Sequence, residues 1–224
     1  MITRFLERLE ARFGRHRGIS NLMTIIVLGT SFVYIADLML PTLMGGASLS
    51  SYLMFNRALI LQGQVWRLIT FIFVPLESHL LLLIISLYFD WIMGQHLQNE
   101  WGTLRFTLFY AVGMLAAIIS GFLTGYTTSY YLNTSLMLAV AILHPNMPIH
   151  LYGIIEVRLK WLAILSLALI VVPLLGGVSW AEAGAVIAAL LNLILFFIDH
   201  IIALGRNAYR RYMWKKNWRG GWKR

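Results

Sequence analysis

The stretch SYYLNTSLMLAVAILHPN, residues 129–146, holds the side chains that come nearest to a catalytic pattern. Most of it is apolar, yet the polar triplet Asn133-Thr134-Ser135 lies inside it. A serine hydroxyl becomes a nucleophile only when a base takes its proton and donors stabilise the oxyanion. The first question is therefore whether any residue could activate Ser129 or Ser135.

Candidate bases for these hydroxyls are few. His79 lies near the start of the second apolar stretch, and the last apolar stretch holds Glu182 near its start and His200 at its opposite end. The chain has no cysteine, so thiolate catalysis is excluded. The sequence therefore predicts no catalytic residue. Asn133, Thr134 and Ser135 are instead predicted to pack and hydrogen-bond between helices, at roughly 1 kcal/mol or less per contact.

The elements that must position these residues are membrane helices. Hydrophobic residues make up 59% of the chain and charged residues 12%, whereas about a quarter of the residues in soluble domains are charged. Each apolar stretch has close to the ~20 residues that a helix needs to cross a bilayer. These stretches are 19–41, 77–97, 104–125, 129–147, 159–178 and 180–203. The predicted fold is all-α, a polytopic six-helix membrane domain over residues 19–204.

Two basic segments flank this domain. Residues 1–18 include an amphipathic pattern, and residues 205–224 place Trp214, Trp218 and Trp222 among lysines and arginines. Trp beside cations suits the lipid headgroup region, so anionic lipid is the predicted partner of both segments. No pattern of an RNA-binding module is present, and nucleic acid is not predicted as a partner.

The distribution of basic residues predicts the orientation. Sixteen of the 18 lysines and arginines fall on one side of the predicted membrane, and only Arg57 and Arg67 fall on the other. By the positive-inside tendency both termini are expected in the cytoplasm.

The segment between the first two stretches is long and apolar, with GQVWRLITFIF at its centre. Backbone at membrane depth needs satisfied hydrogen bonds, so we expect this loop to be embedded in the outer leaflet or packed on the helices. Trp66 is expected at the interface, and Arg67 is expected to anchor the loop through backbone carbonyls or headgroups.

These motifs carry a family resemblance. GQVWRLITFIF resembles the first-loop signature of the rhomboid superfamily, and MGQHLQNEWGTLRF resembles its turn between spans two and three, with Gly94, Glu100 and Gly102 as the matching elements. YYLNTSLMLAVAILHPN is similar to the fourth span of derlins and to short six-span bacterial rhomboid-like proteins, whose IEVRLKWL-type loop is found at residues 155–162. The resemblance implies a bacterial plasma membrane.

The catalytic signature of the superfamily is missing. Its nucleophile, in Gly-x-Ser-Gly, would fall near Tyr130, and neither Ser129 nor Ser135 has flanking glycines. Its base, in Ala-His-x-x-Gly, would fall at or beside Glu182, and His79 is not followed by the Asn of His-x-x-x-Asn. The resemblance therefore implies a pseudoprotease.

Other polar residues lie within the predicted spans. Asp90, in SLYFDWIMG, is several residues inside the second stretch, and a pairing with Arg105 or His200 would explain it. A metal site built from His96, His144 and His200 is not predicted, because no two of them share a helical spacing of three or four residues. In the sixth stretch Gly184 and Ala188 form a small-x-x-x-small pair that favours close helix packing.

These observations predict a catalytically inactive rhomboid-like protein that binds other membrane proteins or transmembrane segments in a locally thinned bilayer, as in membrane-protein quality control. No cofactor is predicted, and no oligomeric state is indicated. An intramembrane serine protease with a non-standard site and a small transporter are the alternatives. A Ser-His pair would indicate the first, and an internal repeat or a line of mid-bilayer charges would indicate the second.

Overall fold

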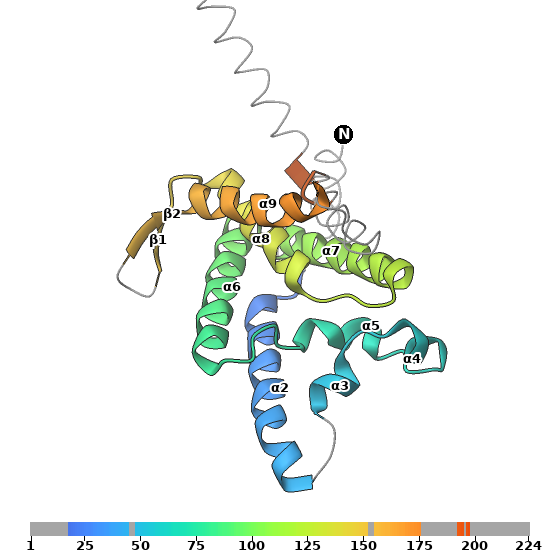
Figure 1. Cartoon of the computed structure of the whole chain (residues 1–224). Helices are drawn as coiled ribbons and strands as arrows, with labels where there is room; N and C mark the ends of the chain where they lie inside the picture. Colours follow the sequence, from blue (N-terminus) through green and yellow to red (C-terminus); the bar gives the residue numbers. More distant parts are fainter. Residues whose placement is uncertain (1–17, 45–47, 152–154, 176–191, 195, 198–224) are drawn as a thin grey trace, which may run out of the picture.

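The computed structural model describes residues 18–44, 48–151, 155–175, 192–194 and 196–197. Helices dominate it, with one short strand pair (Figure 1). The elements in chain order are α2 (Leu22–Met44), α3 (Leu49–Leu53), α4 (Arg57–Leu61), α5 (Arg67–Thr70), η1 (Phe71–Phe73), α6 (Leu80–Trp101), α7 (Thr103–Thr124), α8 (Tyr130–Leu143), β1 (Pro148–Leu151), β2 (Ile155–Arg158) and α9 (Leu159–Leu175).

Three helices of the described chain are long and apolar enough to cross a membrane: Leu22–Leu40 within α2, α6 and α7. Two shorter apolar helices follow, Tyr130–Leu143 and Leu159–Leu169. The first five predicted stretches thus coincide with α2, α6, α7, α8 and α9, with ends displaced by a few residues. The sixth lies largely outside the described residues, although 192–194 and 196–197 are helical. The chain is an all-α, polytopic membrane protein.

α2 and α6 lie side by side, whereas α7 and α9 run across them in this view (Figure 1). Gly94, in the interior of α6, allows the close approach of α2, because a Cβ atom there would lie 2.4 Å from Cγ of Met23. The expectation that Gly94 belongs to the turn after α6 is therefore wrong.

The turn between α6 and α7 is made by Gly102 alone. Its φ of 83° and ψ of 164° belong to a conformation that residues with a side chain rarely adopt. Glu100 lies in the last turn of α6 and is exposed.

The core lies where α6, α7 and α8 meet, and Phe196 and Phe197 pack against it. Trp101 packs its ring on Phe196 and Phe197, with centroid separations of 5.9 and 5.1 Å, and on Phe109 at 5.7 Å. Phe109 and Phe197 are almost fully buried. This aromatic cluster holds the end of α6 against α7 and against Phe196 and Phe197.

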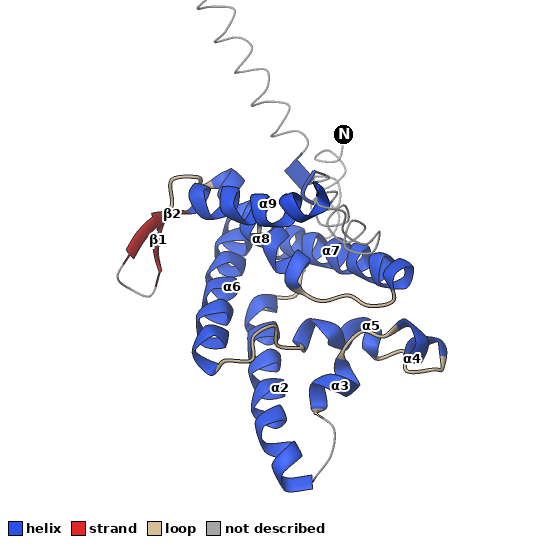
Figure 2. Ribbon diagram, in the orientation of Figure 1, coloured by secondary structure: helices blue, strands red, loops and turns tan. Residues whose placement is uncertain are grey.

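A β-hairpin follows α8, where the sequence analysis expects a loop (Figure 2). β1 and β2 pair antiparallel, with Pro148 opposite Arg158 and Ile149 opposite Val157. Backbone bonds from Leu159 to the Met147 carbonyl, 2.9 Å, and from Lys160 to the Pro145 carbonyl, 3.0 Å, tie its base to the end of α8. Short runs with isoleucine and valine on both sides of a glycine indicate such a hairpin. This signal is weak beside the long apolar stretches that precede and follow it.

Candidate functional site

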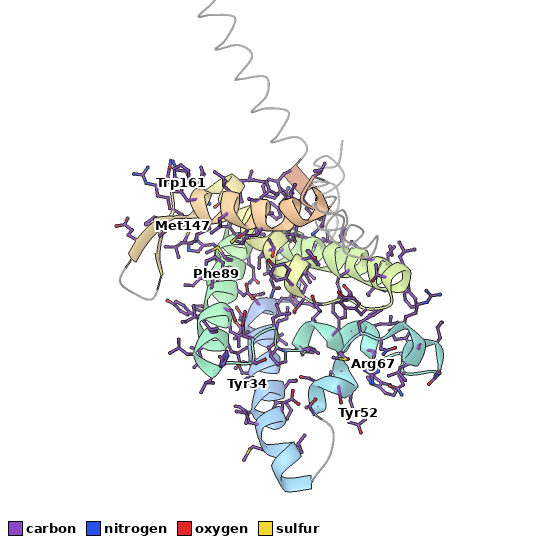
Figure 3. The ribbon with its side chains drawn as sticks, in the orientation of Figure 1. Tyr34, Tyr52, Arg67, Phe89, Met147 and Trp161 are labelled. Atoms are coloured by element: carbon purple, nitrogen blue, oxygen red, sulfur yellow. The ribbon has the colours of Figure 1, made fainter. Side chains whose placement is uncertain are left out.

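Two regions of the described chain hold charged side chains among apolar helices. The first is the outer loop, residues 48–76, which projects to one side of α2 and carries Arg67 and Tyr52 (Figure 3). The second is a cavity between α2, α6 and α8, whose lining includes Phe89, labelled in Figure 3.

Arg67 is the centre of the outer loop. Its side chain is 2% exposed. Nη1 donates to the carbonyls of Ser51, at 2.9 Å, and Met54, at 2.7 Å, and Nε donates to Oε1 of Gln64 at 2.7 Å. Charge-assisted bonds of this length are the strong class, so the guanidinium ties the end of α3 to the start of α5.

The neighbours of Arg67 complete the same task. Trp66 Nε1 donates to the Tyr52 carbonyl at 3.3 Å, and Thr70 Oγ1 donates to the Leu53 carbonyl at 3.0 Å. The backbone carbonyls of residues 51–54 thus each accept one hydrogen bond from the side chain of Trp66, Arg67 or Thr70. The last carbonyls of a helix lack internal partners, and α3 has only five residues. The role of Thr70 was not predicted, although it lies one helical turn from Trp66.

The start of α3 is also capped. Oδ1 of Asp37, within α2, accepts a bond from the backbone N–H of Ser50 at 3.0 Å. A carboxylate suits a helix N-terminus because it complements the free N–H groups. The one buried side-chain atom of the outer loop without a partner, among the described residues, is Oγ of Ser50.

Apolar packing fixes the outer loop to α7. Phe55, 2% exposed, fits against Gly121, where an added Cβ would lie 2.6 Å from its ring. Its ring also contacts Phe71 and Phe122 edge-on, at 6.2 and 5.7 Å. By contrast, Val65 and Ile69 are more than half exposed. An apolar outer face above a packed inner face is what a loop embedded in a membrane leaflet requires.

The cavity has a volume of about 200 Å³. Leu76 and Tyr130 on its rim are 42% and 43% exposed, so it reaches the protein surface. Its polar lining consists of side chains from α2, the outer-loop end, α6, α8 and α9: Thr30, Glu77, Ser86, Asp90, Ser129, Tyr130, Asn133, Thr134 and Ser166.

Asp90 lies halfway along α6, and Nδ2 of Asn133 donates to its Oδ2 at 2.7 Å. Among the described residues the bond to Asp90 comes from the neighbouring helix α8 and not from Arg105. His200, the other predicted partner, lies outside the described residues. Among the described residues, the buried amide oxygen of Asn133 has no hydrogen-bond partner.

The polar triplet of α8 divides between the cavity and the helix. Asn133 and Thr134 line the cavity. Thr134 Oγ1 donates to the Tyr130 carbonyl at 2.8 Å, whereas Ser135, 1% exposed, donates to the Leu132 carbonyl at 2.7 Å. The Ser135 hydroxyl thus donates within its own helix. Of the triplet, only Asn133 and Thr134 line the cavity.

Ser129 and Tyr130, the positions nearest to where the rhomboid resemblance puts its nucleophile, both line the cavity. The described residues that line it include two carboxylates, Glu77 and Asp90, but no histidine, lysine or arginine. The cavity therefore presents hydrogen-bond acceptors and negative charge within an apolar wall.

Other candidates are placed as follows. Gly184, Ala188 and Glu182 lie outside the described residues. Among the described residues no three His, Asp or Glu side chains come together as a metal site. Asn192, which the sequence analysis did not single out, is 2% exposed and donates to the Phe109 carbonyl at 3.4 Å, opposite Gly113.

Comparison with known proteins gives one family. The model of a family described as "Eukaryotic integral membrane protein (DUF1751)" matches residues 20–196. No curated protein matches the chain, and no solved structure matches it. Because the description is of a eukaryotic family, it does not support the bacterial membrane that the rhomboid resemblance implies.

Proposed function

The chain belongs to the DUF1751 family of integral membrane proteins, and on that premise we propose that it is a catalytically inactive, rhomboid-like protein that binds transmembrane segments of other membrane proteins. The segment lies at the rim formed by Leu76 and Tyr130 and directs a polar side chain into the cavity. A role in membrane-protein quality control would follow from such binding.

One observation carries this proposal: the cavity exposes polar groups within the apolar part of the protein. Asp90 is ten residues from the start of α6, about 15 Å along the helix axis. Ionisable groups at that depth are costly and mark functional sites. Among the described residues Asp90 accepts a single hydrogen bond, from Asn133, which leaves capacity for a ligand.

The length of α8 supports a locally thinned bilayer. Its 14 residues span about 21 Å, whereas the hydrocarbon core is about 30 Å thick. A short apolar helix is accommodated by thinning the bilayer around it. A thinner membrane beside the cavity would favour segments that are themselves short or polar.

The absence of proteolysis is part of the proposal. It is supported by the missing Gly-x-Ser-Gly pattern, by the bond of Ser135 to its own helix, and by the lack of histidine among the described residues that line the cavity. Proteolysis at a non-standard site would instead require a base for Ser129.

We also propose the orientation with both termini in the cytoplasm. The chain lacks cysteine, so single cysteines introduced at residues 14, 48 and 220 report on topology directly. Membrane-impermeant labelling from outside should reach residue 48 only. Labelling of residue 14 from outside would contradict the orientation.

The binding proposal is tested by photo-crosslinking in vesicles. A photoreactive residue at Leu76, on the rim, is compared with one at Ile84, which is 58% exposed on α6 but does not line the cavity. Each protein is reconstituted with a single-span Leu/Ala segment or with the same segment carrying a central Gln. Preferential capture of the intact Gln segment from Leu76 alone supports the proposal. Equal capture from both positions, or a cleaved segment, contradicts it.

A further inference from the structure

The cavity contains an imbalance between acceptors and donors. Among the described residues that line it, Asp90 and Glu77 supply carboxylates, and the buried amide oxygen of Asn133 has no partner. Of the six hydroxyls in the wall, Ser86, Thr30 and Thr134 donate to backbone carbonyls of their own helices, and Ser166 is directed at the sulfur of Met137. A ligand would therefore meet these acceptors, with the hydroxyls of Ser129 and Tyr130 as the remaining donors of the described wall.

We propose that the cavity selects transmembrane segments through a cationic side chain, the ammonium of a lysine or the guanidinium of an arginine. This inference rests on the proposed function and specifies its ligand. Asp90 is the counter-charge, and the Asn133 amide oxygen is a second acceptor. Glu77 is the acidic group at the rim, 13 residues earlier in the chain.

The size of the cavity favours a side chain over a helix. Its volume of about 200 Å³ has room for several water molecules and suits one long side chain better than a whole helix about 10 Å across. The flexible stem of Lys or Arg can bury its methylenes along an apolar wall while its charged end reaches a polar group. Such a wall is present, formed by Ile26, Leu83 and Met137.

Charge complementarity at this depth also favours segments with a basic side chain strongly over segments with a neutral or acidic one. A basic residue in the middle of a lone transmembrane segment is costly in hydrocarbon. Contact with Asp90 removes that cost, and it simultaneously gives the carboxylate a partner beyond Asn133. A neutral amide gains hydrogen bonds but no ion pair, and an acidic residue is repelled by both carboxylates.

The test uses the full chain in phosphatidylcholine vesicles, whose headgroup has no N–H donor, with the photoreactive residue at Leu76. Single-span Leu/Ala segments carry a central Lys, Gln, Leu or Glu. We expect the Lys segment to be captured at least tenfold more than the Leu segment, the Gln segment to be intermediate, and the Glu segment to be lowest.

Variants that remove one carboxylate test whether Asp90 and Glu77 cause the preference for the Lys segment. Asp90→Asn should reduce capture of the Lys segment to the level of the Gln segment, and Glu77→Gln should reduce it about threefold. Glu156→Gln, which removes the same charge from the exposed hairpin strand β2, should leave capture unchanged. Thermal unfolding in detergent confirms that each variant is folded.

The outcomes separate the two proposals. Capture of the Gln segment above the Leu segment, with no further preference for Lys or no effect of Asp90→Asn, overturns the cationic inference and leaves the proposed function in place. No preference of any polar segment over Leu overturns both. Loss of Lys capture in phosphatidylethanolamine vesicles would show that a lipid ammonium occupies the cavity, and would overturn the assignment to a segment.

Discussion

The outer loop and the cavity both place a charged side chain among apolar helices, but they treat it differently. In the outer loop, Arg67 makes three bonds of 2.7–2.9 Å, and with Trp66 and Thr70 it serves four consecutive carbonyls. In the cavity, Asp90 has one amide donor among the described residues, and that amide leaves its own oxygen without a partner.

The difference separates a structural charge from a binding charge. A buried ion whose bonds are all made by its own chain stabilises that chain, because removing it leaves several groups unpaired. A buried ion with unused capacity costs stability, and the cost is recovered when a ligand supplies the missing partner. Arg67 fits the first description and Asp90 fits the second.

The largest effect is expected for Arg67→Ala. The substitution leaves the Ser51 and Met54 carbonyls without their donor, and a buried polar group that loses its partner costs about 1–3 kcal/mol. The free energy of unfolding in detergent should fall by that amount.

The matched control for this variant is Arg57→Ala, which removes an exposed arginine from the same loop and should change the free energy of unfolding much less. Equal unfolding midpoints for wild type, Arg67→Ala and Arg57→Ala would show that Arg67 does not hold the loop. Arg67 could then no longer be described as a structural charge.

Arg67→Lys is expected to restore part of that loss. An ammonium can donate to one or two carbonyls, but it cannot reproduce the planar fork that reaches Ser51, Met54 and Gln64 together. Its unfolding midpoint should lie between those of wild type and Arg67→Ala. A midpoint equal to that of wild type would mean that charge, rather than geometry, anchors the loop.

Smaller effects are expected for the hydroxyls. Ser135→Ala and His79→Ala should leave capture of the Gln segment unchanged, and Ser135→Ala should cost no more than the ~1 kcal/mol of an ordinary hydrogen bond. Serine-directed phosphonates should not label the protein. Specific labelling at Ser129 would turn the cavity from a binding site into a catalytic one.

Sequence reasoning located most of the fold because membrane helices are specified by composition and length. The five described stretches were found within a few residues, since about 30 Å of hydrocarbon imposes a run of apolar residues whatever packs beside it. The hairpin at 148–158 was missed because two four-residue strands give a weak signal between two strong ones.

The candidate sites were predictable to different degrees. Trp66 and Arg67 were found because a cation and an indole in an apolar loop have few other uses, and the structure brings both onto carbonyls of α3. Asp90 was recognised as unusual, but its bond to Asn133 was not predicted. Its bond to Asn133 depends on how α6 and α8 pack, which spans 43 residues of chain and leaves no trace in local spacing. Gly94 was placed in the turn by the family resemblance, whereas in the structure it lies inside α6 and packs against Met23 of α2.

The most direct test of the central claim is to measure unfolding and binding together for Asp90→Asn. This variant keeps an acceptor for Asn133 but removes the buried charge. The account predicts a free energy of unfolding within about 1 kcal/mol of wild type, or above it, because a buried charge with one partner contributes little net stability. Capture of the Lys segment should nevertheless fall to the level of the Gln segment. A loss of stability as large as that of Arg67→Ala, with Lys capture intact in the fraction that remains folded, would show that Asp90 is a structural charge and would contradict the account.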